Sequence, residues 1–269
     1  MISLNNAIFF CEILGCKKLF IQNYTKLYLK NKIIDKKYNL SIEPVNFKSL
    51  SLKNIIVLDP RFFYYYHKYI KHEINFSLFK NEILLNLPKI KIFPNDLYIH
   101  IRSGDIFSTP KNNSYSQPPL CFYEKVLNKF KFRKVFIISQ KDNNPVINKI
   151  LNKYNYVIYN KNPLIFDIAY LLNSFNIVQS TSSFLLSIIK LNDKLKILFE
   201  YDFYRLSSRF LHLHYSVYHF PFNYTIYQMK PSRHYQKLMY TWFNSLEQRK
   251  LMINEKCKSN FIIINPFSN

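Results

Sequence analysis

The chain has 269 residues, of which 48% are hydrophobic, and a formal net charge of +22 from 38 basic and 16 acidic side chains. This length is sufficient for one large or two small domains with a real hydrophobic core, and the apolar content excludes a wholly disordered chain. A charge of this size points to a polyanionic partner such as nucleic acid. The basic residues are mostly lysine, however, and are scattered through a chain rich in Asn, Ile, Tyr and Phe. We attribute the charge to the composition of an AT-rich genome and expect no nucleic-acid partner.

The first part of the chain predicts a small α/β region over residues 1–95. Residues 5–15 have a helical pattern that ends at Gly15, a residue well suited to follow a helix C-terminus, and residues 18–22 follow as a short strand. Further short apolar runs, such as residues 55–58, predict additional strands.

Strands and helices alternate regularly over residues 96–205. Apolar runs predict strands at residues 97–101, 135–139, 156–159, 177–178 and 197–199. Helical periodicity predicts helices at residues 120–130, 143–154, 163–175 and 184–191. Continuous apolar strands that alternate with helices are typical of a parallel, doubly wound sheet. We therefore expect a Rossmann-like α/β domain here.

The pattern loosens after Asp202, and we expect a C-terminal extension over residues 206–269. Its main feature is a long closing helix, predicted over residues 234–256. The apolar face of that helix contains Leu238, Trp242, Phe243 and Leu246.

The four cysteines, Cys11, Cys16, Cys121 and Cys257, are widely spaced and include no Cys-x-x-Cys pair. That spacing argues against a structural zinc site. Cys11 and Cys16 lie five positions apart on a predicted helix, where they are poorly aligned for a disulfide. We therefore expect reduced, partly buried thiols.

No apolar run approaches the length of about twenty residues that a transmembrane helix needs, because the run from Ala7 to Leu14 is short and contains Glu12. The first residues also lack the basic region and cleavage site of a signal peptide. We expect a cytoplasmic protein if the chain is complete, and a Golgi or ER membrane protein if an N-terminal anchor has been lost. Membrane association is not encoded within these residues.

A chemically distinctive segment follows the predicted strand at residues 97–101. Arg102 offers a planar fork of N–H donors that suits a phosphate or diphosphate, and Gly104 allows a tight turn near a ligand. Asp105 can hold Arg102, a ribose hydroxyl or a sugar. Ligands of open α/β sheets bind outside the carboxyl ends of the strands, which is where these residues lie. An ordinary turn with a solvated Arg–Asp pair is the alternative interpretation.

A second segment begins at Asp167, on a predicted helix, and continues to the hydroxyl-rich turn Ser180–Phe184 before the next helix. Hydroxyls and free N–H groups at the start of a helix suit an anion, so Ser182 and Ser183 can contact a phosphate or ribose. Simple capping of the helix is an equally good interpretation of this turn alone.

These two segments resemble the donor-binding motifs of the fucosyltransferase superfamily, which includes α-1,2-, α-1,6- and protein O-fucosyltransferases. Residues 99–105 resemble its His-x-Arg-x-x-Asp motif, and residues 167–184 resemble its later donor motif. The resemblance implies that Arg102 holds the β-phosphate of GDP-fucose, that His100 lies close to the nucleotide and that Asp105 supports the site. Further donor contacts are then expected from Gly104, Asp167, Ser182, Ser183 and Phe184.

The resemblance also implies a GT-B-like fold. Residues 96–205 then form the donor domain, and residues 1–95 form a smaller acceptor-side domain. Residues 4–18 resemble the family's first helix and strand but lack the Gly-rich loop that usually precedes them, so we expect an N-terminally shortened domain.

The resemblance implies an inverting transfer of fucose to a glycan or protein hydroxyl. Because the chain contains no Asp-x-Asp, we expect a metal-independent mechanism with no cofactor, in which Arg102 and Asp105 are the catalytic candidates. Tyr115 and Gln117 are expected on the acceptor side. Glu124, on the next helix, is expected to face solvent.

Two alternatives remain open at this point. The first is a non-catalytic relative that binds GDP or a glycan, which the shortened N-terminal region favours. The second is a basic RNA-binding protein, which the net charge favours.

Overall fold

The structure is a computed structural model that describes residues 18–22, 33–35, 40–45, 87–108, 116–159, 161–189, 191–202 and 223–264. The chain divides into two compact units, residues 1–88 and residues 89–269. In the first unit, β1 (Lys18–Gln22) pairs in parallel with β3 (Leu40–Val45), and β2 (Ile33–Asp35) pairs antiparallel with β3. The strand predicted at residues 18–22 is therefore confirmed. The helix predicted at 5–15 and the strand predicted at 55–58 lie outside the described residues.

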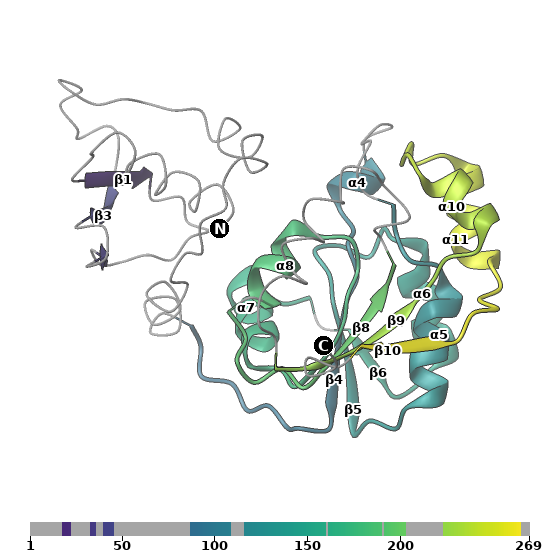
Figure 1. The fold of residues 1–269 in the computed structure, drawn as a ribbon, viewed down its shortest axis with the longest axis horizontal. Coiled ribbons are helices and arrows are strands. Elements are labelled where there is room, and N and C mark those ends of the chain that lie inside the picture. Colours follow the sequence, from purple (N-terminus) through teal and green to yellow (C-terminus); the bar gives the residue numbers. More distant parts are fainter. Residues whose placement is uncertain are drawn as a thin grey trace. The chain divides into compact units, whose positions relative to one another are not determined.

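The second unit contains a seven-stranded sheet with the order β10-β9-β8-β7-β4-β5-β6 (Figure 1). The strands are β4 (Asp96–His100), β5 (Lys134–Ile138), β6 (Val157–Tyr159), β7 (Asn176–Val178), β8 (Ile197–Tyr201), β9 (Thr225–Met229) and β10 (Phe261–Ile264). All neighbouring strands are parallel except β9 and β10. The predicted α/β class and mostly parallel sheet are confirmed, and the sheet is compatible with a Rossmann-like fold. The chain runs outward from β4 to β5 and β6 and then returns to β7, so β4 and β7 form a switch point.

Seven helices are described in this unit. They are α4 (Asp105–Ser108), α5 (Leu120–Lys129), α6 (Pro145–Lys153), α7 (Leu164–Asn173), α8 (Ser183–Ile189), α10 (Arg233–Met239) and α11 (Leu246–Asn254). Side chains cap several of them: Asn144 accepts from the N–H of Val146 at the start of α6, and Ser232 and Ser245 do the same for α10 and α11. Helices α5 and α6 lie on one face of the sheet, and α7 and α8 lie on the other (Figure 1).

Strand alternation divides the core between these two faces. On the α5 and α6 face, alternate strand residues join the apolar stripes of the helices in one buried cluster, which includes Leu97, Ile99, Val135, Ile137, Phe122, Val126, Ile147 and Ile150. On the other face, the Tyr98 ring stacks on Phe136 and on Tyr170 of α7, with centroids 5.1 and 5.6 Å apart. Burial of each large apolar side chain contributes about 1.5–3 kcal/mol.

The single long helix predicted over residues 234–256 is wrong. The structure has two shorter helices, α10 and α11, and Asn244 between them has a φ of 56°. A left-handed residue cannot continue a helix, and the hydroxyl of Ser245 caps α11 directly after it. Of the predicted apolar face, Trp242 is buried, whereas Phe243 and Leu246 are 48% and 68% exposed.

The stretch predicted as a C-terminal extension contributes strands to the main sheet. Strand β9 pairs with β8 in parallel, and β10 pairs with β9 at the edge. Strand β9 mixes an aromatic with polar residues, and β10 is an apolar run of only four residues. The first strand therefore gave no continuous apolar run, and the apolar run of the second was not predicted as a strand.

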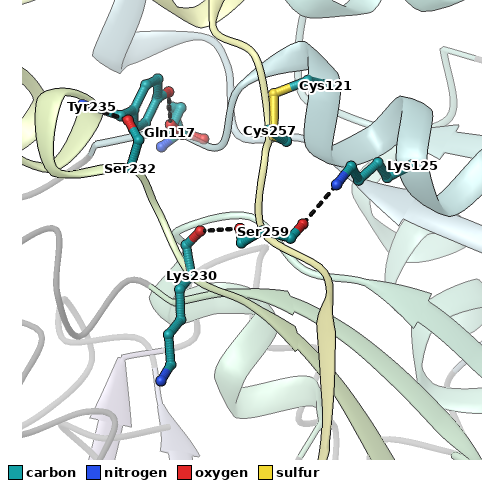
Figure 2. The surroundings of a disulfide bond; sticks show 8 residues. All are labelled: Gln117, Cys121, Lys125, Lys230, Ser232, Tyr235, Cys257 and Ser259. Atoms are coloured by element: carbon teal, nitrogen blue, oxygen red, sulfur yellow. Dashed lines mark hydrogen bonds between the residues drawn. A yellow bond between two sulfur atoms is a disulfide. The ribbon is translucent and has the colours of Figure 1, made fainter.

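A disulfide joins Cys121 of α5 to Cys257, with Cα atoms 5.6 Å apart (Figure 2). This corrects the expectation of reduced thiols at these two positions. The two cysteines are 136 positions apart, and such a pairing is set by the fold, because sequence spacing alone does not define connectivity. Beside the bond, the Lys125 ammonium donates to the Ser259 carbonyl, and the Ser259 hydroxyl donates to the Lys230 carbonyl. The segment between α11 and β10 is therefore fixed to α5.

Within the part of the chain that the structure describes, no helix is both long and apolar enough to cross a membrane.

Candidate functional site

The hydroxyl of Ser180 joins the two segments that the sequence singled out. Ser180 Oγ lies 2.8 Å from Nδ1 of His100, the last residue of β4, and it accepts a hydrogen bond from the backbone N–H of Arg102 at 3.0 Å. Ser180 follows β7, the strand beside β4. One hydroxyl at the switch point therefore fixes both the imidazole and the start of the loop after β4.

His100 is a neutral, buried residue. Its side chain is 6% exposed, and burial together with the nearby charge of Arg102 lowers the pKa of the imidazole to about 3. His100 therefore carries no positive charge near neutral pH, and it acts on a ligand only as a hydrogen-bonding or packing group. The ring of Phe184, which belongs to α8, lies against it with centroids 5.9 Å apart.

Arg102 and Asp105 form an ion pair at the mouth of this loop. Nη2 of Arg102 donates to both carboxylate oxygens of Asp105, at 2.7 and 3.0 Å. The side chains are 23% and 58% exposed, so the pair contributes little to stability because water screens it. Its main consequence is geometric, since Asp105 sets the orientation of the guanidinium plane.

Two asparagines clamp the loop between these residues. The backbone N–H of Gly104 donates to Oδ1 of Asn143 at 2.8 Å, and Nδ2 of Asn143 donates back to the Gly104 carbonyl at 3.1 Å. Nδ2 of Asn144 donates to the Arg102 carbonyl at 2.9 Å. Gly104 has a φ of +73°, and a Cβ there would lie 2.7 Å from Oε1 of Gln140. The predicted use of Gly104 for a tight turn agrees with this conformation.

Helix α4, which carries Asp105, is held by α11 and by the segment between α10 and α11. The indole N–H of Trp242 donates to the Ile106 carbonyl at 2.9 Å, and Nη2 of Arg249 donates to the Phe107 carbonyl at 3.0 Å. The rings of Phe107 and Trp242 meet edge to face at 5.3 Å. A helix of one turn is unstable alone, so these contacts determine where Asp105 lies.

The remaining donor-side candidates are less closely connected. Ser182 is buried, and its hydroxyl accepts from the N–H of Leu185 at 3.4 Å, a weak capping contact. Ser183 begins α8, but its side chain lies outside the described residues. The structure thus brings His100, Arg102 and the Ser180 turn together, and Ser182 follows on the same turn.

Asp167 lies on the first turn of α7. Its side chain is 7% exposed. Burial raises the pKa of this carboxyl to about 7, although a hydrogen bond with Asn162 opposes the rise. The charge of Asp167 in turn helps to raise the pKa of Tyr159, which is raised first by burial. Its predicted contact with a donor stays a prediction.

On the predicted acceptor side, Tyr115 lies outside the described residues. Gln117 is wholly buried, and its carbonyl accepts from the hydroxyl of Tyr235 at 2.6 Å (Figure 2). The neighbouring Ser116 donates to the Met239 carbonyl and accepts from Thr181. The acceptor-side role of Gln117 stays a prediction.

Glu124, which was expected to face solvent, is partly covered. Its side chain is 22% exposed, and the carboxylate pairs with Lys153 at 2.7 Å. The pair connects α5 to the end of α6.

Among the described residues, no group of three or more His, Cys, Asp or Glu side chains is arranged to hold a metal ion.

Sequence reasoning missed Ser180, Asn143 and Asn144 as parts of the site. The sequence predicts a role for the hydroxyl-rich turn, but it favours Ser182 and Ser183 over Ser180 as the contacting residues. A usable signal was present at Asn144, because Asn directly before Pro145 is a strong helix-start pattern. That pattern places both asparagines at the carboxyl edge of the sheet.

No protein-family model, no curated protein and no solved structure matches this chain.

Proposed function

We propose that the chain is a glycosyltransferase that transfers a sugar from a nucleotide donor, GDP-fucose first among the candidates, to a hydroxyl of a glycan or a protein. The observation that carries the proposal is the hydroxyl of Ser180, which joins His100 to Arg102. It unites two segments that each resemble a donor-binding motif, at the switch point where parallel sheets usually bind ligands. A GT-B-like pairing of an acceptor-side unit with this donor unit is part of the same proposal.

Arg102 carries the proposed chemistry. In an inverting transfer, the acceptor oxygen attacks the anomeric carbon, the bond from that carbon to the diphosphate breaks, and the acceptor proton passes to a base. Negative charge develops on the leaving diphosphate, and a guanidinium is well suited to neutralise it. Asp105 holds Nη2 of Arg102, which makes Asp105 a positioning residue for the fork. Because Arg102 neutralises the charge of the leaving diphosphate, the proposed mechanism uses no metal ion.

The other residues of the turn complete the proposed donor site. Neutral His100 offers hydrogen bonding to the nucleotide without adding charge, and Phe184 shields its ring. Gly104 allows the left-handed turn that follows Arg102 in this loop. Ser182 and Ser183 offer hydroxyls for a phosphate or ribose.

Donor identity is tested by measuring the thermal stability of the whole chain with GDP-fucose, GDP-mannose, GDP and UDP-linked sugars. A ligand that binds only the folded state raises the melting temperature. We expect GDP-linked ligands to stabilise the protein. A response to UDP-linked sugars alone would overturn the fucosyl assignment.

Turnover is tested with labelled GDP-fucose, by following hydrolysis and transfer to galactose, N-acetylglucosamine and peptide acceptors. We expect release of GDP that depends on Arg102. Binding without release of GDP would identify a non-catalytic relative. Retention on RNA with a steep salt dependence, unchanged in an Arg102→Ala variant, would instead support the RNA-binding alternative.

A further inference from the structure

Four polar residues form one row across the sheet, at the edge where the candidate site lies. Continuing the β4–β7 register by one residue beyond the Ile99–Val178 pair places His100 beside Gln179, and continuing the β7–β8 register places Gln179 beside Glu200. Glu200 pairs directly with Gln228 of β9. All four side chains are buried, with exposed fractions of 3–8%.

The row faces helices α7 and α8. Side chains alternate along a strand, so His100 shares its face with Tyr98, which stacks on Tyr170 of α7. One step toward the amino ends of the strands, the same face is entirely apolar, with Tyr98 followed by Ile177, Leu198 and Ile226. Polar character therefore begins abruptly at the layer beside the Arg102 loop.

A buried polar row is costly unless its members are hydrogen-bonded. His100 bonds to Ser180, and Gln228 donates to Glu200 at 3.4 Å. The side chain of Gln179 is 4% exposed, and its Oε1 accepts no hydrogen bond from any described residue. Gln179 directly precedes Ser180, the residue that holds the Arg102 backbone.

Gln248 offers a direct comparison because it is also 4% exposed. Its Nε2 donates to the carbonyls of Leu238 and Thr241, and its Oε1 accepts from the N–H of Phe243. This is how a purely structural buried glutamine is satisfied. The open acceptor of Gln179 differs, and it lies in the layer next to the candidate site.

We propose that Gln179 is a ligand-binding residue, whose amide bonds a hydroxyl of the sugar or ribose that flanks the diphosphate held by Arg102. This inference rests on the proposed function and deepens it, because it assigns the row His100–Gln179–Glu200 to the polyhydroxylated part of the donor. A site built to hydrogen-bond a hydroxyl discriminates strongly against ligands that lack it. Gln179 thus contributes to specificity, while Arg102 contributes charge.

The first experiment measures the thermal stability of the ligand-free chain with Gln179→Leu and, as a matched control, Gln248→Leu. Replacing an open buried acceptor by an apolar group of similar shape is neutral or stabilising, whereas removing three satisfied bonds is destabilising. We expect Gln179→Leu to keep or raise the melting temperature and Gln248→Leu to lower it. An equal loss in both variants would overturn the inference, because Gln179 would then be structural.

The second experiment measures the affinity of the unchanged chain and of Gln179→Leu for pyrophosphate, GDP and GDP-fucose. We expect unchanged affinity for pyrophosphate, which has no sugar hydroxyl, and a loss of at least about fivefold for a hydroxyl-bearing ligand. A loss for GDP and GDP-fucose assigns Gln179 to the ribose, and a loss for GDP-fucose alone assigns it to the transferred sugar. If Gln179→Leu binds each of the three ligands as tightly as the unchanged chain does, the inference is overturned and the proposed function stands. If the unchanged chain binds none of them, the proposed function fails and this inference fails with it.

Discussion

Ser180 Oγ lies 2.8 Å from Nδ1 of His100, although the two residues are 80 positions apart in the sequence. Their strands, β7 and β4, are neighbours at the switch point of the sheet. The same hydroxyl accepts the N–H of Arg102, so the contact orders the loop proposed to bind the diphosphate.

Replacing Ser180 with alanine is expected to weaken GDP binding by about tenfold and to cost about 1–3 kcal/mol of stability. The N–H of Arg102 loses its acceptor, and His100 loses its partner. Calorimetry with GDP and thermal unfolding measure the two effects. Ser174→Ala is the matched control, because that buried hydroxyl donates to the Leu171 carbonyl at 3.0 Å, away from the loop. We expect Ser174→Ala to reduce stability alone, and an equal loss of GDP affinity in both variants would show that the effect is general.

Gly104→Ala is expected to destabilise the protein by about 1–2 kcal/mol, because a φ of +73° is strained for any residue with a Cβ. The added Cβ also meets the side chain of Gln140, which is exposed. Combining the change with Gln140→Ala removes that contact but leaves the backbone strain. Thermal unfolding should therefore show only partial recovery in the double variant. Full recovery would contradict the role assigned to the backbone of Gly104.

Asp167→Asn is expected to stabilise the protein at pH 8 and to change little at pH 4. The folded-state pKa of about 7 is above the ordinary value of 3.8, so the folded state binds more protons between these values. The stability contributed by Asp167 is therefore present below about pH 4 and is lost as the pH rises to 7. We expect a rise of at least about 3 °C at pH 8 in thermal unfolding. His100, whose pKa is lowered to about 3, makes the stability depend on pH in the opposite direction. Because His100 is present in both the unchanged chain and Asp167→Asn, its contribution cancels when their stabilities are compared. An asparagine variant that is less stable at pH 8 would contradict the raised pKa of the buried Asp167 carboxyl.

Reduction of the Cys121–Cys257 bond is expected to lower the stability of the second unit by about 4 kcal/mol, because the bond closes a long loop. Thermal unfolding with and without a reducing agent measures the change. A Cys121→Ala, Cys257→Ala double variant should unfold like the reduced protein and should not respond to the reducing agent. A reductant effect of equal size in that variant would assign the stabilisation to something other than this bond.

The sequence predicted the middle of the fold well because local signals determine it. The apolar runs in β4, β5 and β8 are continuous, and the helices between them have clear periodicity. The prediction of a long closing helix was wrong because the apolar spacing continues through Asn244, where the backbone adopts a left-handed conformation. No pattern in the sequence alone identified that break, although a serine able to cap a helix follows it.

The candidate site was predictable only where its chemistry is contained in one segment. Arg102, Gly104 and Asp105 lie within four consecutive residues, and their arrangement follows from one turn. Ser180 and Asn143 are placed by strand pairing, and a hydroxyl or amide far away in the sequence carries no signal of its own. The pairing of Cys121 with Cys257 escaped prediction for the same reason.

The most direct test of the proposed function is calorimetric titration of the whole chain with GDP, compared with Arg102→Gln and Lys153→Gln. Arg102 and Lys153 each form an ion pair with a 2.7 Å contact, and in each pair one side chain is more than half exposed. Each variant removes the cation of its pair, so general effects of charge are matched. We predict that the unchanged chain and Lys153→Gln bind GDP equally, and that Arg102→Gln weakens binding by at least about tenfold, the loss expected for a charge-assisted hydrogen bond. GDP binding that is unchanged in Arg102→Gln would contradict the claim that Arg102 holds the diphosphate.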